Sequence, residues 1–189
     1  MAWLTFNVGQ NMKRLFSVLA AAVSTVTGFA ESTPMKTIAY RGGVISFRIP
    51  ADWKEEYQPE GGGMFYSERP GAGTLRLNVL TFEAPPGKLA VDGYSHLAAS
   101  PLAPDERLMK MALGDGVKVY KKEVEEEETK LDMYCWTIAH CAPPKKLYLA
   151  NFTWVILRSQ SSDPKFQKEI EFLTEQISKA SFHPDLGKK

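Results

Sequence analysis

Cysteine is scarce in this sequence: Cys135 and Cys141 are the two that its 189 residues contain. We expect both to lie on one β-strand, where six residues separate two Cα atoms by about 20 Å. A disulfide joins residues whose Cα atoms are less than about 7 Å apart. The spacing therefore predicts two small buried thiols and no disulfide between them.

An excess of either charge is also missing. Lysine and arginine together number 23, against 22 aspartates and glutamates, so the formal net charge is +1. A nucleic-acid-binding protein needs a basic surface to neutralise phosphates, and this balance argues against such a partner. No apolar run reaches the roughly 20 residues that a transmembrane helix needs. With 44% hydrophobic and 24% charged residues, the chain has the composition of an ordinary globular domain.

Patterns that carry catalysis or bind metals are missing too. There is no Gly-x-Ser-x-Gly turn, and the glycines at 61–63 lack the Lys-Ser/Thr of a phosphate-binding loop. Ser95 and His96 are helix neighbours whose side chains diverge. His140 and Cys141 point to opposite faces of a strand and are poorly placed to share an ion. We predict no catalytic residue, no metal and no cofactor; the alternative is a hydrolase-type site that joins His96 to a distant carboxylate.

Residues 1–34 have the order of a secretory signal. Within residues 12–30, a basic start is followed by an apolar run and by Gly28 and Ala30, small residues that suit a cleavage site. Cleavage after Ala30 would place the protein in the periplasm or outside the cell. The alternative is a translation start at Met35, which would leave the N-terminal segment untranslated and the protein cytoplasmic.

Alternation of apolar and polar residues predicts β-strands through most of the remaining chain. Near the C-terminus, Asp163 and Pro164 are a good N-cap and first residue for a helix whose apolar positions repeat at helical spacing. We predict an α+β fold, an antiparallel sheet of about six strands with helices on both faces. The predicted strands are 45–49, 64–66, 74–82, 117–127, 131–141 and 147–158, and the predicted helices are 89–99, 105–113 and 164–180.

Four aromatic residues suggest a binding surface. Tyr134 and Trp136 share a face of one predicted strand, and Phe152 and Trp154 share a face of the next. If these faces coincide, the four form a patch that could bind a peptide or an apolar ligand. The alternative is that the middle helices cover them and that they belong to the core.

A further aromatic pair, Trp53 and Tyr57, flanks two glutamates close to the glycines at 61–63. We expect this pair to form a rim of the binding surface; the alternative for Trp53 is a core position at the end of a strand. The candidate binding face therefore comprises Trp53, Tyr57, Tyr134, Trp136, Phe152 and Trp154.

The order of these elements resembles the PsbP-like fold, an α/β/α sandwich. The resemblance rests on a strand ending at Ile49-Pro50 with Trp53 after it, and on the run Phe152-Thr153-Trp154. Members of that superfamily include the PsbP protein of photosystem II, Ran-binding Mog proteins and small bacterial domains, some of them chaperones for type VI secretion effectors. The resemblance implies a single domain over residues 35–184, with a tail at 185–189, and binding more often than catalysis.

These observations lead to one main hypothesis and two alternatives. The main hypothesis is a non-catalytic binding or accessory domain that recognises a protein or peptide partner. The alternatives are an exported envelope assembly factor, which depends on the signal-like segment, and the hydrolase-type enzyme. The sequence gives neither the partner nor the oligomeric state.

Overall fold

The computed structural model describes residues 34–59, 61–85, 87–183 and 185. They belong to one compact unit that starts at residue 33. The signal-like segment lies outside the described residues, so export stays a prediction. No helix in the described part of the chain has the length and apolar character needed to cross a bilayer.

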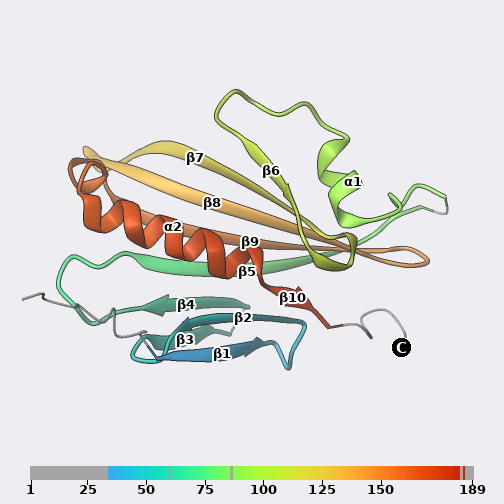
Figure 1. The fold of residues 1–189 in the computed structure, drawn as a ribbon, viewed down its shortest axis with the longest axis horizontal. Helices are drawn as coiled ribbons and strands as arrows, with labels where there is room; N and C mark the ends of the chain where they lie inside the picture. The colour runs from blue at the N-terminus through green and yellow to red at the C-terminus, as the bar shows by residue number, and fades with distance from the viewer. Residues whose placement is uncertain (1–33, 60, 86, 184, 186–189) are drawn as a thin grey trace, which may run out of the picture. The chain divides into compact units, whose positions relative to one another are not determined.

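Two antiparallel sheets form the domain (Figure 1). The smaller sheet has the order β1-β2-β10, and the larger has the order β3-β4-β5-β9-β8-β7-β6. The strands are β1 (Met35–Tyr40), β2 (Ile45–Pro50), β3 (Lys54–Gln58), β4 (Gly62–Tyr66), β5 (Thr74–Glu83), β6 (Arg107–Lys110), β7 (Gly116–Glu126), β8 (Thr129–Ala142), β9 (Lys146–Leu157) and β10 (Ser181–Phe182). The helices are α1 (Gly93–Ala98) and α2 (Pro164–Ser178), with single 3₁₀ turns η1 (Ala112–Gly114) and η2 (Arg158–Gln160).

The core lies on one face of the larger sheet. Phe152 and Trp154 of β9 are fully buried and project from this face. Phe47 of β2 packs edge-on against Phe152 with ring centroids 5.0 Å apart. Phe166 of α2 packs against Trp154 at 5.8 Å. The smaller sheet and α2 therefore cover the same face of the larger sheet, side by side (Figure 1).

The α+β class agrees with the prediction, but the arrangement differs in three respects. Ten described strands form two sheets, not six strands in one. A helix layer on each face is not confirmed, because the layer over the aromatic face contains β1 and β2 as well as α2. The predicted helix at 105–113 is wrong: residues 107–110 pair with β7 as an edge strand, and a 3₁₀ turn follows.

Helix α1 is shorter than predicted. The side chain of Asp92 accepts a hydrogen bond from Ser95 N at 2.7 Å and caps the first turn, so the helix begins at Gly93. The helix contacts β6, β7 and β8. A Cβ at Gly93 would lie 1.8 Å from the carbonyl oxygen of Ala139, so this close approach to β8 requires glycine.

The two cysteines are free, as predicted, and lie on β8, but Cys135 is buried whereas Cys141 is only half-buried. Burial raises the pKa of the Cys135 thiol above its ordinary value. Burial also raises the pKa of Cys141, to about 11, with Asp92 and Asp115 adding to the effect. Both thiols are therefore protonated at neutral pH and poor nucleophiles.

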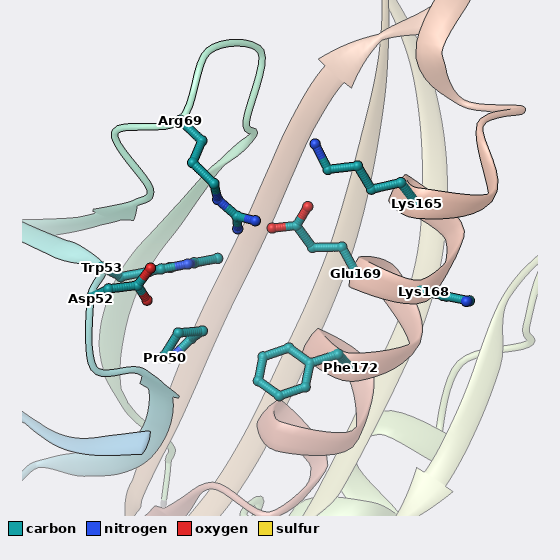
Figure 2. Close-up of a pocket in the computed structure, with 8 residues that line it drawn as sticks. All are labelled: Pro50, Asp52, Trp53, Arg69, Lys165, Lys168, Glu169 and Phe172. Carbon is teal, nitrogen blue, oxygen red and sulfur yellow. The ribbon is translucent and has the colours of Figure 1, made fainter. Parts of the chain in front are cut away.

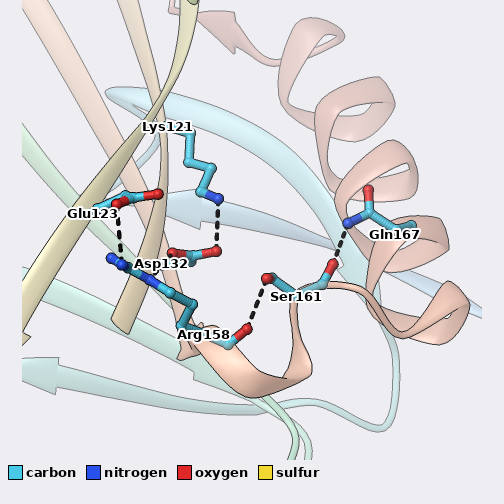
Figure 3. A network of polar contacts seen from close by, with 6 residues as sticks. All are labelled: Lys121, Glu123, Asp132, Arg158, Ser161 and Gln167. Atoms are coloured by element: carbon cyan, nitrogen blue, oxygen red, sulfur yellow. Dashed lines mark hydrogen bonds and ion pairs between the residues drawn. The ribbon is translucent and has the colours of Figure 1, made fainter. Parts of the chain in front are cut away.

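An ion network around a buried carboxylate joins strands β7 and β8 of the larger sheet to the start of α2 (Figure 3). The carboxylate of Asp132 on β8 is fully buried and lies 2.7 Å from Lys121 Nζ and 3.2 Å from Arg158 Nε. Ser161 Oγ donates to the carbonyl oxygen of Arg158 at 2.8 Å, and Gln167 Nε2 donates to the carbonyl oxygen of Ser161. The network thereby fixes where the chain leaves β9 and enters α2.

Candidate functional site

A groove opens where three segments meet: the turn after β2, the loop between β4 and β5, and the first half of α2 (Figure 2). Its volume is about 400 Å³. Pockets that bind small ligands or short chain segments commonly start at a few hundred Å³. Its lining residues are Pro50, Asp52, Trp53, Arg69, Lys165, Lys168, Glu169 and Phe172.

Trp53 forms the floor of the groove and is held there by the turn that ends β2. Trp53 N donates to the carbonyl oxygen of Pro50 at 3.2 Å, and Lys36 Nζ donates to the carbonyl oxygen of Trp53 at 2.6 Å. The side chain is 2% exposed, and its Nε1 has no hydrogen-bond acceptor among the described residues. This nitrogen is itself buried, so its missing hydrogen bond costs the fold free energy.

Arg69 enters from the loop between β4 and β5. Its Nε donates to the hydroxyl of Ser67 at 2.8 Å, and Ser67 is itself buried. This hydrogen bond orients the guanidinium, whose terminal nitrogens point across the groove toward Glu169 (Figure 2). The terminal N–H groups have no carboxylate partner among the described residues, which leaves a planar donor group facing the groove.

The first turns of α2 supply the opposite wall. The side chain of Asp163 accepts from Lys165 N at 2.8 Å and caps the helix, and Pro164 occupies its first position. Helical spacing then places Lys165, Glu169 and Phe172 on one side. Figure 2 shows these three side chains extending toward the turn that carries Trp53.

Glu169 is the titratable group that this environment perturbs. Burial raises the pKa of its carboxyl above the ordinary 4.5, and the nearby charges of Arg69 and Lys165 only partly offset that effect. The carboxylate makes no hydrogen bond or ion pair with any described residue. Perturbed titratable groups in a cleft are characteristic of functional sites, although ion networks also produce them.

The groove thus combines hydrogen-bond donors with one acceptor and an apolar wall. Arg69 donates, Glu169 accepts, and the rings of Trp53 and Phe172 provide the apolar surface. No nucleophile lies beside a base in this set. Elsewhere in the described residues there is no group of three His, Cys, Asp or Glu side chains suited to a metal. The arrangement is suited to binding.

A second hollow, of about 580 Å³, lies between α2 and strands β6 to β8. Two of its charged side chains are already paired within the fold. Lys121 pairs with Asp132, and Glu175 forms an i,i+4 pair with Lys179. The lining of this second hollow therefore holds fewer charged side chains without an ion-pair partner than the lining of the groove at Trp53 does.

The four residues of the predicted aromatic patch do lie together, but three of them are interior, and Tyr134 is partly buried and lines the second hollow. Tyr134 lies opposite Trp154, and Trp136 lies opposite Phe152, in the register of β8 and β9. Trp136, Phe152 and Trp154 are 0% exposed. Trp136 Nε1 also donates to Thr174 Oγ1 of α2 at 3.0 Å. Trp136, Phe152 and Trp154 are therefore core residues, and α2 and β2 cover them, not the middle helices. These contacts do not test whether the residues also take part in binding.

The remaining predicted pair is separated. Trp53 is buried in the groove, whereas Tyr57 lies on β3 and is 54% exposed. Tyr57 packs against the rings of Tyr40 and Phe65 and donates its hydroxyl hydrogen to Glu55 at 2.6 Å. Partial burial, together with that hydrogen bond, raises the pKa of Tyr57 to about 12. Of the six predicted residues, Trp53 is the one that lines the groove.

The alternative catalytic site is not assembled in the described part of the chain. The side chain of His96 makes no hydrogen bond or ion pair there. His140 does meet a carboxylate, with its Nδ1 2.8 Å from Asp115 Oδ1, and its ring stacks on Phe182 at 5.0 Å. This pair joins β8 to the segment before β7 and has no serine or cysteine nucleophile in hydrogen-bond contact. A hydrolase activity stays an untested alternative.

Comparison with known proteins adds information on the fold. No protein-family model matches the chain, and no curated protein matches it in sequence. A solved structure from Bacteroides thetaiotaomicron aligns over 79% of this chain and 49% of its own, with a TM-score of 0.51 and 19% identity. LpqN, described as involved in cell envelope biogenesis of Mycobacterium tuberculosis, aligns over 80% of this chain and 91% of its own, with a TM-score of 0.52 and 11% identity.

What this chain shares with these structures is the fold. It spans about half of the Bacteroides protein. The yeast Ran-binding protein Mog1p aligns over 80% of this chain and 96% of its own at 11% identity, but its TM-score of 0.48 is too low to carry an argument. The likeness to the Bacteroides structure and to LpqN is one of fold alone, so the PsbP-like resemblance stays a prediction.

Proposed function

We propose that this protein is a non-catalytic binding domain that recognises a peptide segment of a partner protein in the groove between Trp53 and α2. The observation that carries the proposal is a groove of about 400 Å³ that Trp53 and Phe172 line with their rings and into which the Arg69 guanidinium points. A ligand that brings an acceptor to the terminal N–H groups of Arg69 gains a hydrogen bond that the free domain lacks.

A peptide segment suits the remaining groups. Each peptide unit carries one N–H donor and one carbonyl acceptor. The carbonyl oxygens match the terminal N–H groups of Arg69, while the N–H groups match the carboxylate of Glu169. Apolar side chains of the segment would pack on Phe172 and Pro50.

One specific observation favours an envelope role as a second, narrower candidate. LpqN, which shares the fold, is described as involved in cell envelope biogenesis. The basic, apolar and small-residue order of residues 12–30 is that of an export signal. Together they support an exported accessory factor whose partner is an envelope protein, with the same groove as its binding site.

The proposal is tested by selection from a library of displayed 12-residue peptides against the full chain. Recovered peptides are then synthesised, labelled and titrated by fluorescence anisotropy into the wild type and into Arg69→Ala. Loss of the guanidinium removes charge-assisted hydrogen bonds, so we expect binding to weaken about tenfold or more. Thermal melts establish that the variant is folded.

Arg48→Ala is the matched control. Arg48 is exposed on β2, outside the groove, and makes no hydrogen bond or ion pair with any described residue. We expect its affinity for the peptides to equal that of the wild type. Enrichment of no peptide, or equal binding by Arg69→Ala and wild type, would overturn the proposal.

A further inference from the structure

The larger sheet has an outer face, turned away from α2 and the smaller sheet. Residues of this face alternate along β5 and β9 with core residues such as Leu75 and Phe152, which project to the covered face. Helix α1 packs on the outer face at one end, where a Cβ at Gly116 would lie 2.7 Å from Tyr94 Cα. Toward the other end the outer face is open to solvent, and Leu157 is exposed there.

A hollow of about 240 Å³ lies on this outer face, over β4, β5 and β9. The sheet register sets its polar side chains in two rows: Arg76 lies opposite Thr153, and Asn78 lies opposite Asn151. Side chains that are directly opposite on neighbouring strands have Cβ atoms about 5 Å apart. Four polar groups from two strands are therefore held close together by the backbone of the sheet.

The fold leaves these hydrogen-bonding groups largely unused. The side chains of Arg76, Asn78 and Thr153 make no hydrogen bond or ion pair with any described residue. Thr137 Oγ1 donates to Asn151 Oδ1 at 2.9 Å, which leaves the two N–H donors of that amide without a partner among the described residues. Amides and hydroxyls both donate and accept, and so do the hydroxyl groups of a saccharide.

Charge on the outer face favours an anion. The described lining of the hollow contains one charged side chain, Arg76, and no carboxylate. On β7 of the same face, Lys118 and Lys122 lie over the ring of Tyr120, each with its Nζ 5.4 Å from the ring centroid. Lys118 is paired with Glu106 at 3.1 Å, whereas Lys122 forms no direct ion pair with a described residue.

The two basic positions lie in one row across the sheet. Arg76 is opposite Thr153, Thr153 is opposite Cys135, and Cys135 is opposite Tyr120. Three strand spacings separate the ends of this row, a distance of about 14 Å. A ligand that meets both ends is therefore elongated and lies across the strands.

We propose that the outer face of the larger sheet binds an acidic polysaccharide. One saccharide unit occupies the hollow, with its hydroxyl groups on Asn78, Asn151 and Thr153 and its carboxylate on Arg76. The polysaccharide continues across β9 and β8 toward Lys122. Guanidinium groups bind carboxylates through two parallel hydrogen bonds, and the open strand face of another fold, the OB-fold, binds oligosaccharides.

A second copy of this chain is a poorer occupant of the same face. Two outer faces packed together would enclose Arg76 in a hollow whose described lining offers no carboxylate. A buried charge without a partner is costly. The hollow also shares no lining residue with the groove at Trp53, so the proposed site is additional to the peptide site.

The test titrates labelled oligogalacturonate into the full chain at low salt, followed by fluorescence anisotropy. Two further probes separate its chemical features. In the first, the carboxyl groups are reduced to hydroxymethyl groups, which removes the charge and keeps the sugar hydroxyls. The second, polyaspartate, carries carboxylates without hydroxyl groups. We expect each to bind about tenfold more weakly than oligogalacturonate, or worse.

Three variants locate the site. Arg76→Gln should weaken binding of oligogalacturonate about tenfold and bring its affinity close to that of the reduced probe. Asn78→Ala should weaken binding of both saccharides about fivefold, because it removes a hydrogen bond to a hydroxyl group. Arg48→Gln, at an exposed position of β2 in the smaller sheet, is the matched control and should bind like the wild type. Thermal melts establish that each variant is folded.

Absence of oligogalacturonate binding would overturn the inference, and so would equal binding of polyaspartate. Equal affinities of Arg76→Gln and the wild type would also overturn it, since the saccharide would then bind elsewhere. Tighter binding to vesicles that contain phosphatidylglycerol than to oligogalacturonate would assign the face to lipid instead. None of these results bears on the peptide site, which is tested through Arg69→Ala.

Discussion

Asp132 and Lys121 form an ion pair in the interior, with Asp132 Oδ2 2.7 Å from Lys121 Nζ. The Asp132 side chain is fully buried, and Arg158 Nε approaches its other oxygen to 3.2 Å. Arg158 also reaches Glu123 Oε2 at 3.0 Å near the surface (Figure 3). Since η2 and the start of α2 continue from Arg158, the helical wall of the groove depends on this buried carboxylate.

Removal of that carboxylate should be costly. Asp132→Ala removes the charged hydrogen bonds to Lys121 and Arg158, and because these two side chains are 38% and 35% exposed and can be solvated, we expect a cost of about 1.5–3 kcal/mol. Urea unfolding followed by tryptophan fluorescence measures the loss. Glu123→Ala is the control: its carboxylate is 64% exposed, so we expect a change below about 1 kcal/mol. Equal stability losses in the two variants would contradict the network as described.

The same carboxylate predicts a pH dependence of stability. Burial acts to raise the pKa of Asp132, but hydrogen bonds from Lys121, Ser161 and Arg158 outweigh it and hold the pKa below the ordinary 3.8. A carboxyl with a lowered folded pKa contributes stability that is present above 3.8 and is lost as the pH falls through the lower value. Urea midpoints between pH 7 and pH 2.5 should show this acid loss in the wild type and a smaller one in Asp132→Asn.

Trp154 should act as a core residue. It is 0% exposed, its ring packs on Phe166, and a Cβ at Gly73 would lie 2.2 Å from its Nε1. We therefore expect Trp154→Ala to cost about 3–5 kcal/mol of unfolding free energy. A melting temperature equal to that of the wild type would show that the side chain is not packed as described.

Glu169→Gln should stabilise the unliganded protein at neutral pH. A carboxyl whose folded pKa is raised gives stability that is full below its ordinary value of 4.5 and is lost as the pH rises through the raised value. Glutamine avoids that loss. The melting temperature of the variant should exceed that of the wild type at pH 7.5, and the two should converge near pH 4. A variant that melts below the wild type at pH 7.5 would contradict this assignment.

Local pattern was sufficient to predict much of the fold. Alternation gave strands close to β2, β5, β7, β8 and β9, and the Asp163-Pro164 start with its apolar repeat gave α2. Both cysteines were placed on one strand and unbridged. These features depend on periods of two and 3.6 residues and on capping chemistry, which neighbouring residues determine.

Features set by tertiary pairing were missed. Residues 107–110 contain Leu and Met among basic residues, a composition that suits a helix as well as an edge strand, and pairing with β7 decides between them. Strand β3 carries mainly charged, exposed side chains and lacks an apolar face that could reveal it. That β2 belongs to a separate sheet follows from its packing on Phe152, which strand pattern does not encode.

The groove illustrates the same limit. Its residues come from three segments, and the helical repeat alone could have placed Lys165, Glu169 and Phe172 on one side of α2. Nothing in the sequence sets them opposite Trp53 and Arg69. Trp53 was a candidate because it and Tyr57 flank two glutamates near the glycines at 61–63, but the residues that lie opposite it become visible only in the structure.

The most direct test of the account is the indole N–H resonance of Trp53 in a two-dimensional ¹⁵N–¹H spectrum, recorded during titration with a selected peptide. If the groove is the binding site, the Trp53 signal shifts strongly and the Arg69 Nε–H signal moves with it. The Trp136 indole, bonded to Thr174, stays in place as an internal control. A bound peptide that leaves the Trp53 signal unmoved would contradict the central claim.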